Sequence, residues 1–265
     1  MMGETQPVGE LLRTWRQRRR LSQLDLSVEA EISTRHLSFI ETGRARPSRD
    51  MVLHLAERLD VPLRERNVLL VAAGFAPSFR DHGFKEPGAD PLRQAVDLIL
   101  KGHEPYPALA VDRHWTLVAA NGAVQRLMTV EEPALLAPPI NVLRITLHPG
   151  GLAPRIANLV EWRAHVLERL RRQVETSADP TLAALLDELR TYPAPHRPAG
   201  SPPPGLDLTG IVVPFRLSTE GGVLSFFSTT TVFGTPLDVT LSELALETFY
   251  PADEATQAAL RNPPA

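Results

Sequence analysis

Apolar residues recur every three or four positions through the first third of the chain. Val8, Leu11, Leu12 and Trp15 share one helical face, which predicts a helix over about residues 7–19. The same spacing, with serines at starts and glycines at ends, predicts further helices at about 23–30, 34–41, 48–59 and 64–73. We therefore expect an all-α, five-helix domain over residues 1–75.

The helical pattern stops after residue 75. Residues 76–90, APSFRDHGFKEPGAD, hold proline, glycine and charged residues without periodicity, which predicts a linker or hinge. Asp90 and Pro91 then supply an N-cap and a proline at the first helical position, so another helix is expected to about Lys101.

Beyond residue 107 the pattern changes to short β-rich runs. VDRHWTLVAAN predicts a hairpin that turns at residues 112–114 and is followed by a short helix, GAVQRLM. Helices at 154–174 and 179–190, a proline-rich loop, three strands and a last helix after Pro251 complete the chain; the strands are GIVVPFRLS, GGVLSFFSTTTVF and ELALETFY. This order predicts an α+β domain over 91–265, with an antiparallel sheet and its helices collected on one side.

Composition excludes several classes of protein. The chain has 265 residues and no cysteine, so disulfides, thiol catalysis and cysteine-ligated metals are excluded. It has no long apolar run and no apolar leader, and we expect a cytoplasmic protein without a membrane partner. The eight histidines show no metal-ligand spacing, and no nucleotide-loop or serine-hydrolase motif occurs. We expect no enzyme activity, no metal and no cofactor.

The charge is distributed unevenly. Residues 1–80 carry 13 arginines, no lysine and 10 acidic residues, whereas the whole chain has a net charge of −3. A mildly basic N-terminal part joined to an acidic remainder is expected where the N-terminal part binds a polyanion. Arginine also suits bidentate contacts to phosphate or guanine.

Residues 8–62 resemble the XRE-type helix-turn-helix domain of the phage repressors. The match runs without a gap from Leu21 to Pro47, and the stretches that carry it are LSQLDL and ISTRHLSFIETGRARPS. The resemblance implies that Gln23 binds a DNA phosphate and that the third helix, capped by Ser33, lies in the major groove. It implies base contacts at Thr34, Arg35, His36, Ser38 and Phe39, phosphate contacts at Thr42, Arg44 and Arg46, and a structural pair of Arg16 with Glu41.

The side-chain chemistry agrees with a DNA contact. Arg35 can bond guanine O6 and N7 bidentately, which gives about 1–3 kcal/mol of discrimination between bases. Phe39 can either contact a thymine methyl group or pack within the domain. The alternative is a helical protein-interaction module whose Thr-Arg-His face is simply solvated, carried on a scaffold domain.

The remainder of the chain resembles the ligand-binding domain of MmyB-like transcriptional regulators. The stretches involved are VDRHWTLVAAN, NVLRITLHPGGL, VLSFFSTTTVFGTPLDVT and ETFYPADEATQAALR. The resemblance implies a PAS-like fold that encloses a pocket, and a small lipophilic ligand, fatty acids included.

The predicted strands and the long helix supply candidate pocket residues. The apolar candidates are Val213, Phe215, Leu217, Leu224, Phe226 and Phe227. The polar candidates are His148, Arg155, Asn158, Trp162 and, further along, His165. Arg155 is expected in the first turn of the long helix, with Asn158 and Trp162 on the same side, where a carboxylate would find donors. Ordinary core packing and surface ion pairs are the alternative interpretation of these residues.

Together these observations predict a ligand-responsive transcriptional regulator that binds double-stranded DNA as a homodimer. The ligand would act through the 76–90 segment and change either the distance between the two helix-turn-helix domains of the dimer or their freedom to move. An enzyme that uses the C-terminal pocket on a lipid is a further alternative.

Overall fold

The computed structural model describes residues 6–81, 84, 90–177, 179–193, 213–233 and 238–261. The chain divides into two compact units. The first contains residues 1–82 together with 235–242, and the second contains residues 83–234 and 243–265. The following paragraphs take each unit by itself.

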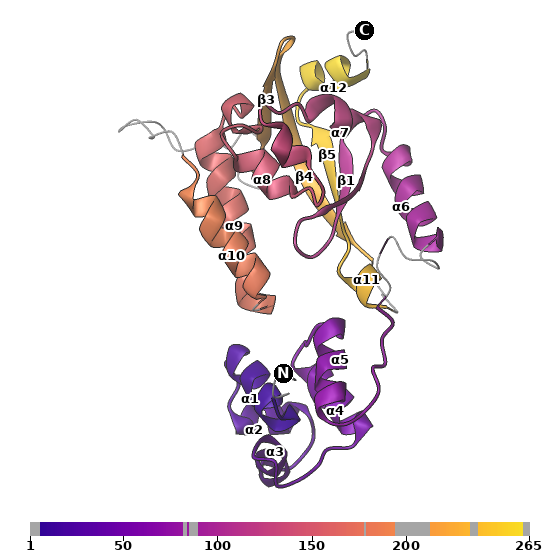
Figure 1. Cartoon of the computed structure of the whole chain (residues 1–265), viewed down its shortest axis with the longest axis vertical. Helices are drawn as coiled ribbons and strands as arrows, with labels where there is room; N and C mark the ends of the chain where they lie inside the picture. Colours follow the sequence, from indigo (N-terminus) through magenta and orange to yellow (C-terminus); the bar gives the residue numbers. More distant parts are fainter. Residues whose placement is uncertain are drawn as a thin grey trace. The chain divides into compact units, whose positions relative to one another are not determined.

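The first unit is built from the five predicted helices (Figure 1). They are α1 (Val8–Arg18), α2 (Gln23–Glu29), α3 (Thr34–Glu41), α4 (Arg49–Arg58) and α5 (Leu63–Ala72). Their inner faces form one core in which Leu12, Leu26, Leu37 and Leu55 are fully buried. The expected all-α helix-turn-helix architecture is therefore confirmed.

Serine side chains start three of these helices. The hydroxyl groups of Ser22, Ser33 and Ser48 each accept a hydrogen bond from the backbone N–H three residues later, and Ser22 forms a full capping box with Asp25. Gly43, with φ of +73°, takes the left-handed conformation just after α3. These local signals define where α3 begins and ends.

Helices α1 and α3 approach each other closely at Gly9. A β-carbon built on this residue would lie 2.3 Å from the carbonyl oxygen of Ile40 and 2.8 Å from that of Glu41. Only glycine leaves room for this packing, which sets the distance between α1 and the end of α3.

The first unit also contains a short helix, α11 (Val239–Ser242), which the sequence analysis did not predict and had assigned to the C-terminal domain. Val239 is fully buried, and its N–H donates to the carbonyl oxygen of Arg80 at 2.8 Å.

The second unit is organised around a five-stranded antiparallel sheet of order β2-β1-β5-β4-β3. Its strands are β1 (Ala108–Val111), β2 (Leu117–Ala120), β3 (Phe215–Thr219), β4 (Gly222–Val232) and β5 (Ala245–Pro251). The predicted hairpin forms β1 and β2, and the three later runs form β3, β4 and β5. The α+β class with an antiparallel sheet is confirmed.

Helices cover both faces of this sheet, so the expectation of helices on one side was wrong. Helix α6 (Asp90–Gly102) packs on one face through Val96 and Leu100, because its apolar stripe meets the small side chains of Ala108 and Ala110. The other face carries most of the remaining helices (Figure 1). These are α7 (Gly122–Leu127), α8 (Val142–Leu147), α9 (Leu159–Ser177) and α10 (Pro180–Thr191). Helix α12 (Glu254–Arg261) packs against β4, and the 3-10 turns are η1 (Pro133–Leu136) and η2 (Ala153–Arg155).

The long helix begins later than the sequence pattern predicted. Residues 156–158 pair with β3: Ile156 forms a bridge with Leu217, and the N–H of Ala157 donates to the carbonyl oxygen of Arg216 at 2.9 Å. The N–H of Ala157 is therefore satisfied by a strand and not by a helix, and α9 starts at Leu159 instead of residue 154.

Three predicted features lie partly outside the described residues. They are the linker at 82–83 and 85–89, the proline-rich loop from 194 onward, and the first three residues of the run GIVVPFRLS.

Replacing Gly9 by alanine is expected to destabilise the first unit. The new methyl group would force α1 away from the backbone of Ile40 and Glu41, at a cost of about 1–3 kcal/mol. Thermal unfolding followed by circular dichroism measures the change. The matched control is Gly102→Ala, where nothing lies within 4 Å of the added carbon; equal effects of the two substitutions would contradict the argument.

Candidate DNA-binding and ligand-binding sites

The first turn of α3 presents a polar surface. Arg35 and His36 are exposed, whereas Leu37 and Ile40 on the opposite face are buried. Thr34 is half-buried, and its hydroxyl group lies 2.8 Å from that of Ser27 in α2. Of the first three residues of the helix, Arg35 and His36 are thus the more accessible.

Phe39 lies one turn further along α3, half-buried, between two arginines. Its ring centroid is 5.3 Å from the guanidinium carbon of Arg35 and 6.0 Å from that of Arg44. Its carbonyl oxygen accepts hydrogen bonds from the N–H groups of Arg44 and Ala45. The ring of Phe39 thus lies within cation–π distance of both guanidinium groups, in addition to any packing within the domain.

Arg16, Gln23 and Glu41 form one buried network. Arg16 Nε and Nη2 donate to the two carboxylate oxygens of Glu41 at 2.7 and 2.9 Å. The hydrogen bond with Glu41 raises the pKa of Arg16. Gln23 Nε2 donates to Glu41 Oε2 at 2.8 Å, so the side chain assigned to phosphate binding is oriented from inside the domain. One amide hydrogen of Gln23 remains for a phosphate.

The other residues implied as phosphate contacts follow α3. Thr42, Arg44 and Arg46 are exposed, and the hydroxyl group of Thr42 donates to the carbonyl oxygen of Ser38 at 2.7 Å. Ser38 itself is half-buried. Together with Arg35, His36 and Gln23, these residues lie on α3 or near one of its two ends.

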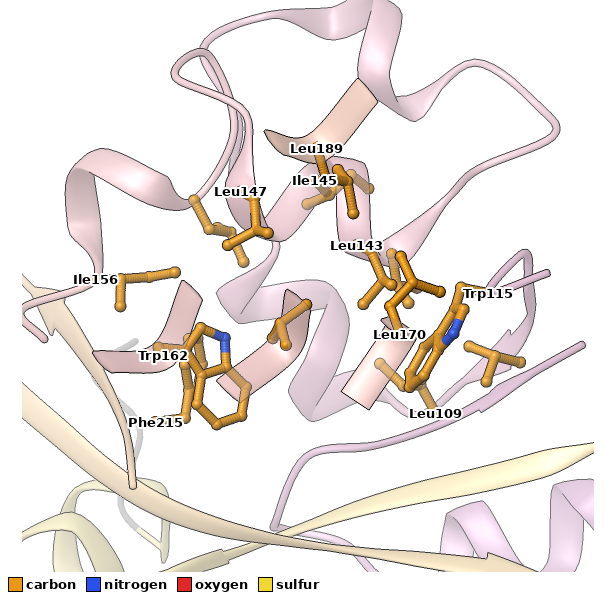
Figure 2. Packing of buried hydrophobic residues seen from close by; sticks show 14 of the residues in the cluster. Leu109, Trp115, Leu143, Ile145, Leu147, Ile156, Trp162, Leu170, Leu189 and Phe215 are labelled. Carbon is orange, nitrogen blue, oxygen red and sulfur yellow. The ribbon is translucent and has the colours of Figure 1, made fainter. Parts of the chain in front are cut away.

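The second unit holds an apolar cavity of about 80 Å³ between the sheet and the helices that cover it. Trp162, Phe215 and Phe226 line it, with the ring centroids of Trp162 and Phe215 5.0 Å apart (Figure 2). Its other walls come from β1, β5, α7 and α8; they include Leu109, Val124, Leu127, Met128, Val142, Ile145, Thr146, Leu152, Leu217 and Phe249. No ionisable side chain is among the residues that line the cavity.

Successive side chains of a strand point to opposite faces of the sheet, so only some of the apolar candidates face the cavity. Phe215, Leu217 and Phe226 face the cavity, whereas Phe227 points to the opposite face and stacks on Tyr250. Leu224 lines a neighbouring cleft, and Val213 lines neither. The assignment of Phe227 to the pocket was therefore wrong.

Arg155 does not lie in the first turn of the long helix, and that expectation was wrong. It ends the turn η2 and lines an open cleft of about 810 Å³ next to the cavity. Its guanidinium group donates to backbone carbonyl oxygens of Leu127, Thr129 and Ser218 at 3.3 Å, and also to the Thr129 hydroxyl group. Leu127 lines both the cavity and the cleft.

The side chains of Asn158 and His148 form hydrogen bonds with backbone groups. Asn158 Nδ2 donates to the carbonyl oxygen of Pro214 at 2.8 Å, and its Oδ1 accepts from the N–H of Arg216 at 3.1 Å. His148 Nδ1 accepts from the N–H of Gly150 at 3.0 Å. Neither residue lines the cavity or the cleft, so Arg155, Asn158 and Trp162 do not form one polar site.

His165 stacks on Trp162 with 5.4 Å between ring centroids. Burial, assisted by the charge of Arg169, lowers the pKa of His165. This shift favours the neutral form of the imidazole next to Trp162.

Sequence reasoning missed the contribution of α8 to the cavity. Asn141 caps this helix by accepting from the N–H groups of Leu143 and Arg144, which is a recognisable start signal. Val142, Ile145 and Thr146 then supply one wall. The helix has only six residues, too few for its period to stand out.

Two further classes of site are absent from the part of the chain that the structure describes. No group of three or more histidine, aspartate or glutamate side chains there could hold a metal ion. No described helix is both long and apolar enough to cross a membrane.

Comparison with known proteins gives two family matches. Residues 7–69 match a helix-turn-helix domain, and residues 92–262 match the MmyB-like transcription regulator ligand binding domain. One similar solved structure, an RNA-binding light-oxygen-voltage receptor, shares 14% identity over 95% of this chain and 61% of that chain. The TM-score of 0.24 is too low to indicate a shared fold. No curated protein matched. The two family domains are those of a regulator and not of an enzyme, and the chain belongs to the MmyB-like transcription regulators, with a DNA-binding helix-turn-helix domain ahead of its ligand-binding domain.

Proposed function

We propose that α3 enters the major groove of an operator and that Arg35 and His36 contact base edges there. The observation that carries this proposal is the exposure of these two side chains on the first turn of a helix whose other face is buried. Gln23, Thr42, Arg44 and Arg46 would bind phosphates on either side, which positions the helix in the groove.

The second unit would sense a small lipophilic molecule, for which fatty acids are candidates. An apolar chain suits the cavity, and the predicted residue Arg155 lines the adjoining cleft together with Arg126. A fatty acid would therefore pass Leu127, with its carboxylate beside Arg155.

The size of the cavity limits what enters it. Its volume of about 80 Å³ is well below the roughly 300–1,000 Å³ of sites for drug-sized ligands. A long chain would require α7 or α8 to move, whereas a compact group fits as the walls stand. Leaving such a cavity unfilled costs on the order of 2 kcal/mol, which favours a ligand that fills it.

We further propose that the protein binds DNA as a homodimer. One helix-turn-helix head reads a short half-site, and two heads about 34 Å apart read successive major-groove faces. A ligand would alter this arrangement only by binding one conformation better than another.

The substitution Arg35→Ala is expected to relax base preference at one operator position, because about 1–3 kcal/mol of discrimination is lost there. Selection from a random duplex library, followed by binding to single-base operator variants, measures it. The matched control is Arg58→Ala, an exposed arginine of α4 outside the proposed contacts. An equal loss on all sequences would make Arg35 a phosphate contact instead.

The substitutions Gln23→Ala and Arg44→Ala are expected to differ in salt dependence. Both should weaken binding to every duplex, but only Arg44→Ala removes a charge, so only it should lower the salt slope by about 1. Titrations of a random duplex at several salt concentrations measure the slopes. A wild-type protein without any salt dependence would overturn the DNA-binding proposal and favour a protein-interaction module.

Native and denaturing mass spectra of the purified protein are expected to report a dimer and any copurified molecule. A mass increment that is lost on denaturation would belong to a non-covalent ligand. A monomer at micromolar concentration would contradict the homodimer proposal.

A further inference from the structure

Helix α6 has a second apolar surface besides the one that packs on the sheet. Its buried stripe, Val96 and Leu100, contacts β1 and β2. Leu98 is nevertheless 74% exposed and Ile99 is 39% exposed, and Leu98 is the most exposed large apolar side chain of the described residues. Single exposed apolar residues are common, whereas two adjacent ones on a helix that already has a buried stripe point to a contact surface.

Two small residues extend this surface along the helix. Residues three or four apart are neighbours on a helix, so Ala95 lies one turn before Leu98 and Ile99, and Gly102 lies one turn after them. Gly102 is exposed, and a carbon added there would meet nothing within 4 Å. Together Ala95, Leu98, Ile99 and Gly102 form the outer α6 surface, whose large side chains between small ones suit packing against another helix.

Two charges border the outer α6 surface. Asp97 and Lys101 are exposed, and neither forms an ion pair with another residue that the structure describes. Their four-residue spacing would permit a pair within the helix, as Glu168 and Arg172 form on α9 at 2.9 Å. Both charges of α6 are therefore available to a partner.

A second copy of the chain fits this arrangement of charges. In a two-fold pair each residue i contacts residue j of the partner, and j contacts i. If two α6 helices pair antiparallel with the axis at the level of Ile99, Asp97 of each copy lies opposite the partner subunit's Lys101. Parallel pairing in register would place like charges together, so the charges favour the antiparallel arrangement.

Antiparallel pairing also separates the two points at which the chains enter α6. Asp90, the first residue of the helix, lies nine residues before Ile99. At a rise of about 1.5 Å per residue, the two copies of Asp90 would be about 27 Å apart along the helix pair. This separation is of the same order as the about 34 Å between successive major-groove faces, so it suits a protein that reads two half-sites.

We propose that the outer α6 surface is the dimer interface of this protein, where two α6 helices pair antiparallel and Asp97 pairs with the partner subunit's Lys101. The inference rests on the proposed homodimer and identifies the surface that forms it. One helix face is smaller than the roughly 800 Å² per partner of a standard interface. The dimer is therefore expected to be reversible and to depend strongly on Leu98.

Sedimentation equilibrium of the full chain measures the dimer dissociation constant. Leu98→Gln is expected to raise it about a hundredfold, because one leucine of each copy loses its burial. Glutamine is a good helix former and Leu98 is exposed in the single chain, so the unfolding temperature of the monomer should not change. The matched control is Leu24→Gln, at a leucine of α2 that is 62% exposed, which should leave the dissociation constant unchanged.

Charge exchange tests the direction of the pairing. Asp97→Lys and Lys101→Asp should each weaken the dimer about fivefold, because each places like charges opposite one another. The double variant should recover the wild-type dissociation constant. An equimolar mixture of the two single variants, one of them labelled with ¹⁵N, should give mainly mixed dimers in native mass spectra.

A wild-type dimer that is insensitive to Leu98→Gln, or equally sensitive to Leu24→Gln, would overturn the proposed interface and leave the homodimer intact. Single charge variants without effect, or a double variant without recovery, would contradict the antiparallel pairing. If Leu98→Gln lowers the unfolding temperature of the monomer and not the dimer affinity, another segment of the same chain covers the surface and the proposal fails. A wild-type chain that stays monomeric would overturn both this inference and the proposed homodimer.

Discussion

The pairing of residues 156–158 with strand β3 determines the architecture of the ligand-binding domain. Asn158 donates to the carbonyl oxygen of Pro214 and accepts from the N–H of Arg216, so one amide satisfies two backbone groups at the start of β3. Because α9 can begin only after this pairing ends, Trp162 falls in its first turn and packs on Phe215. The helix, the strand and the cavity between them therefore share one anchor.

A comparable constraint acts in the helix-turn-helix domain. The carboxylate of Glu41 is buried, and it is stable there only because Arg16 and Gln23 donate to it. These three residues join α1, α2 and the end of α3, and Gly9 allows the close approach that the network needs. The fixed position of α3 explains how the polar and basic residues at its start are held on the outer face of the domain.

The parts of the structure that follow from local rules could be predicted from the sequence. Serine caps and apolar periods gave the five helices of the head, and strand patterns gave the hairpin and the three later strands. Pairing between distant segments could not be read in this way. The 154–174 pattern is helical by itself, and only the edge of β3, some sixty residues later, takes residues 156–158 out of the helix. That change separates Arg155, Asn158 and Trp162, which an unbroken helix would place together. Adjacent Phe226 and Phe227 cannot both face one cavity, and only the register of β4 decides which does.

The two candidate binding regions of the domain make different demands on a ligand. Arg155 already donates to three backbone carbonyl oxygens, so a carboxylate in the cleft has to share a cation that also holds the chain together. The cavity, by contrast, has no ionisable side chain among the residues that line it, so a group bound there competes with no such hydrogen bonds. A ligand shifts a conformational equilibrium only by the difference in its affinity for the two states. Side chains of α7, α8, α9 and the sheet line the cavity, so a group that fills it would contact all of these elements at once. An apolar group in the cavity is therefore better suited to stabilise one conformation of the domain than a charged group in the open cleft.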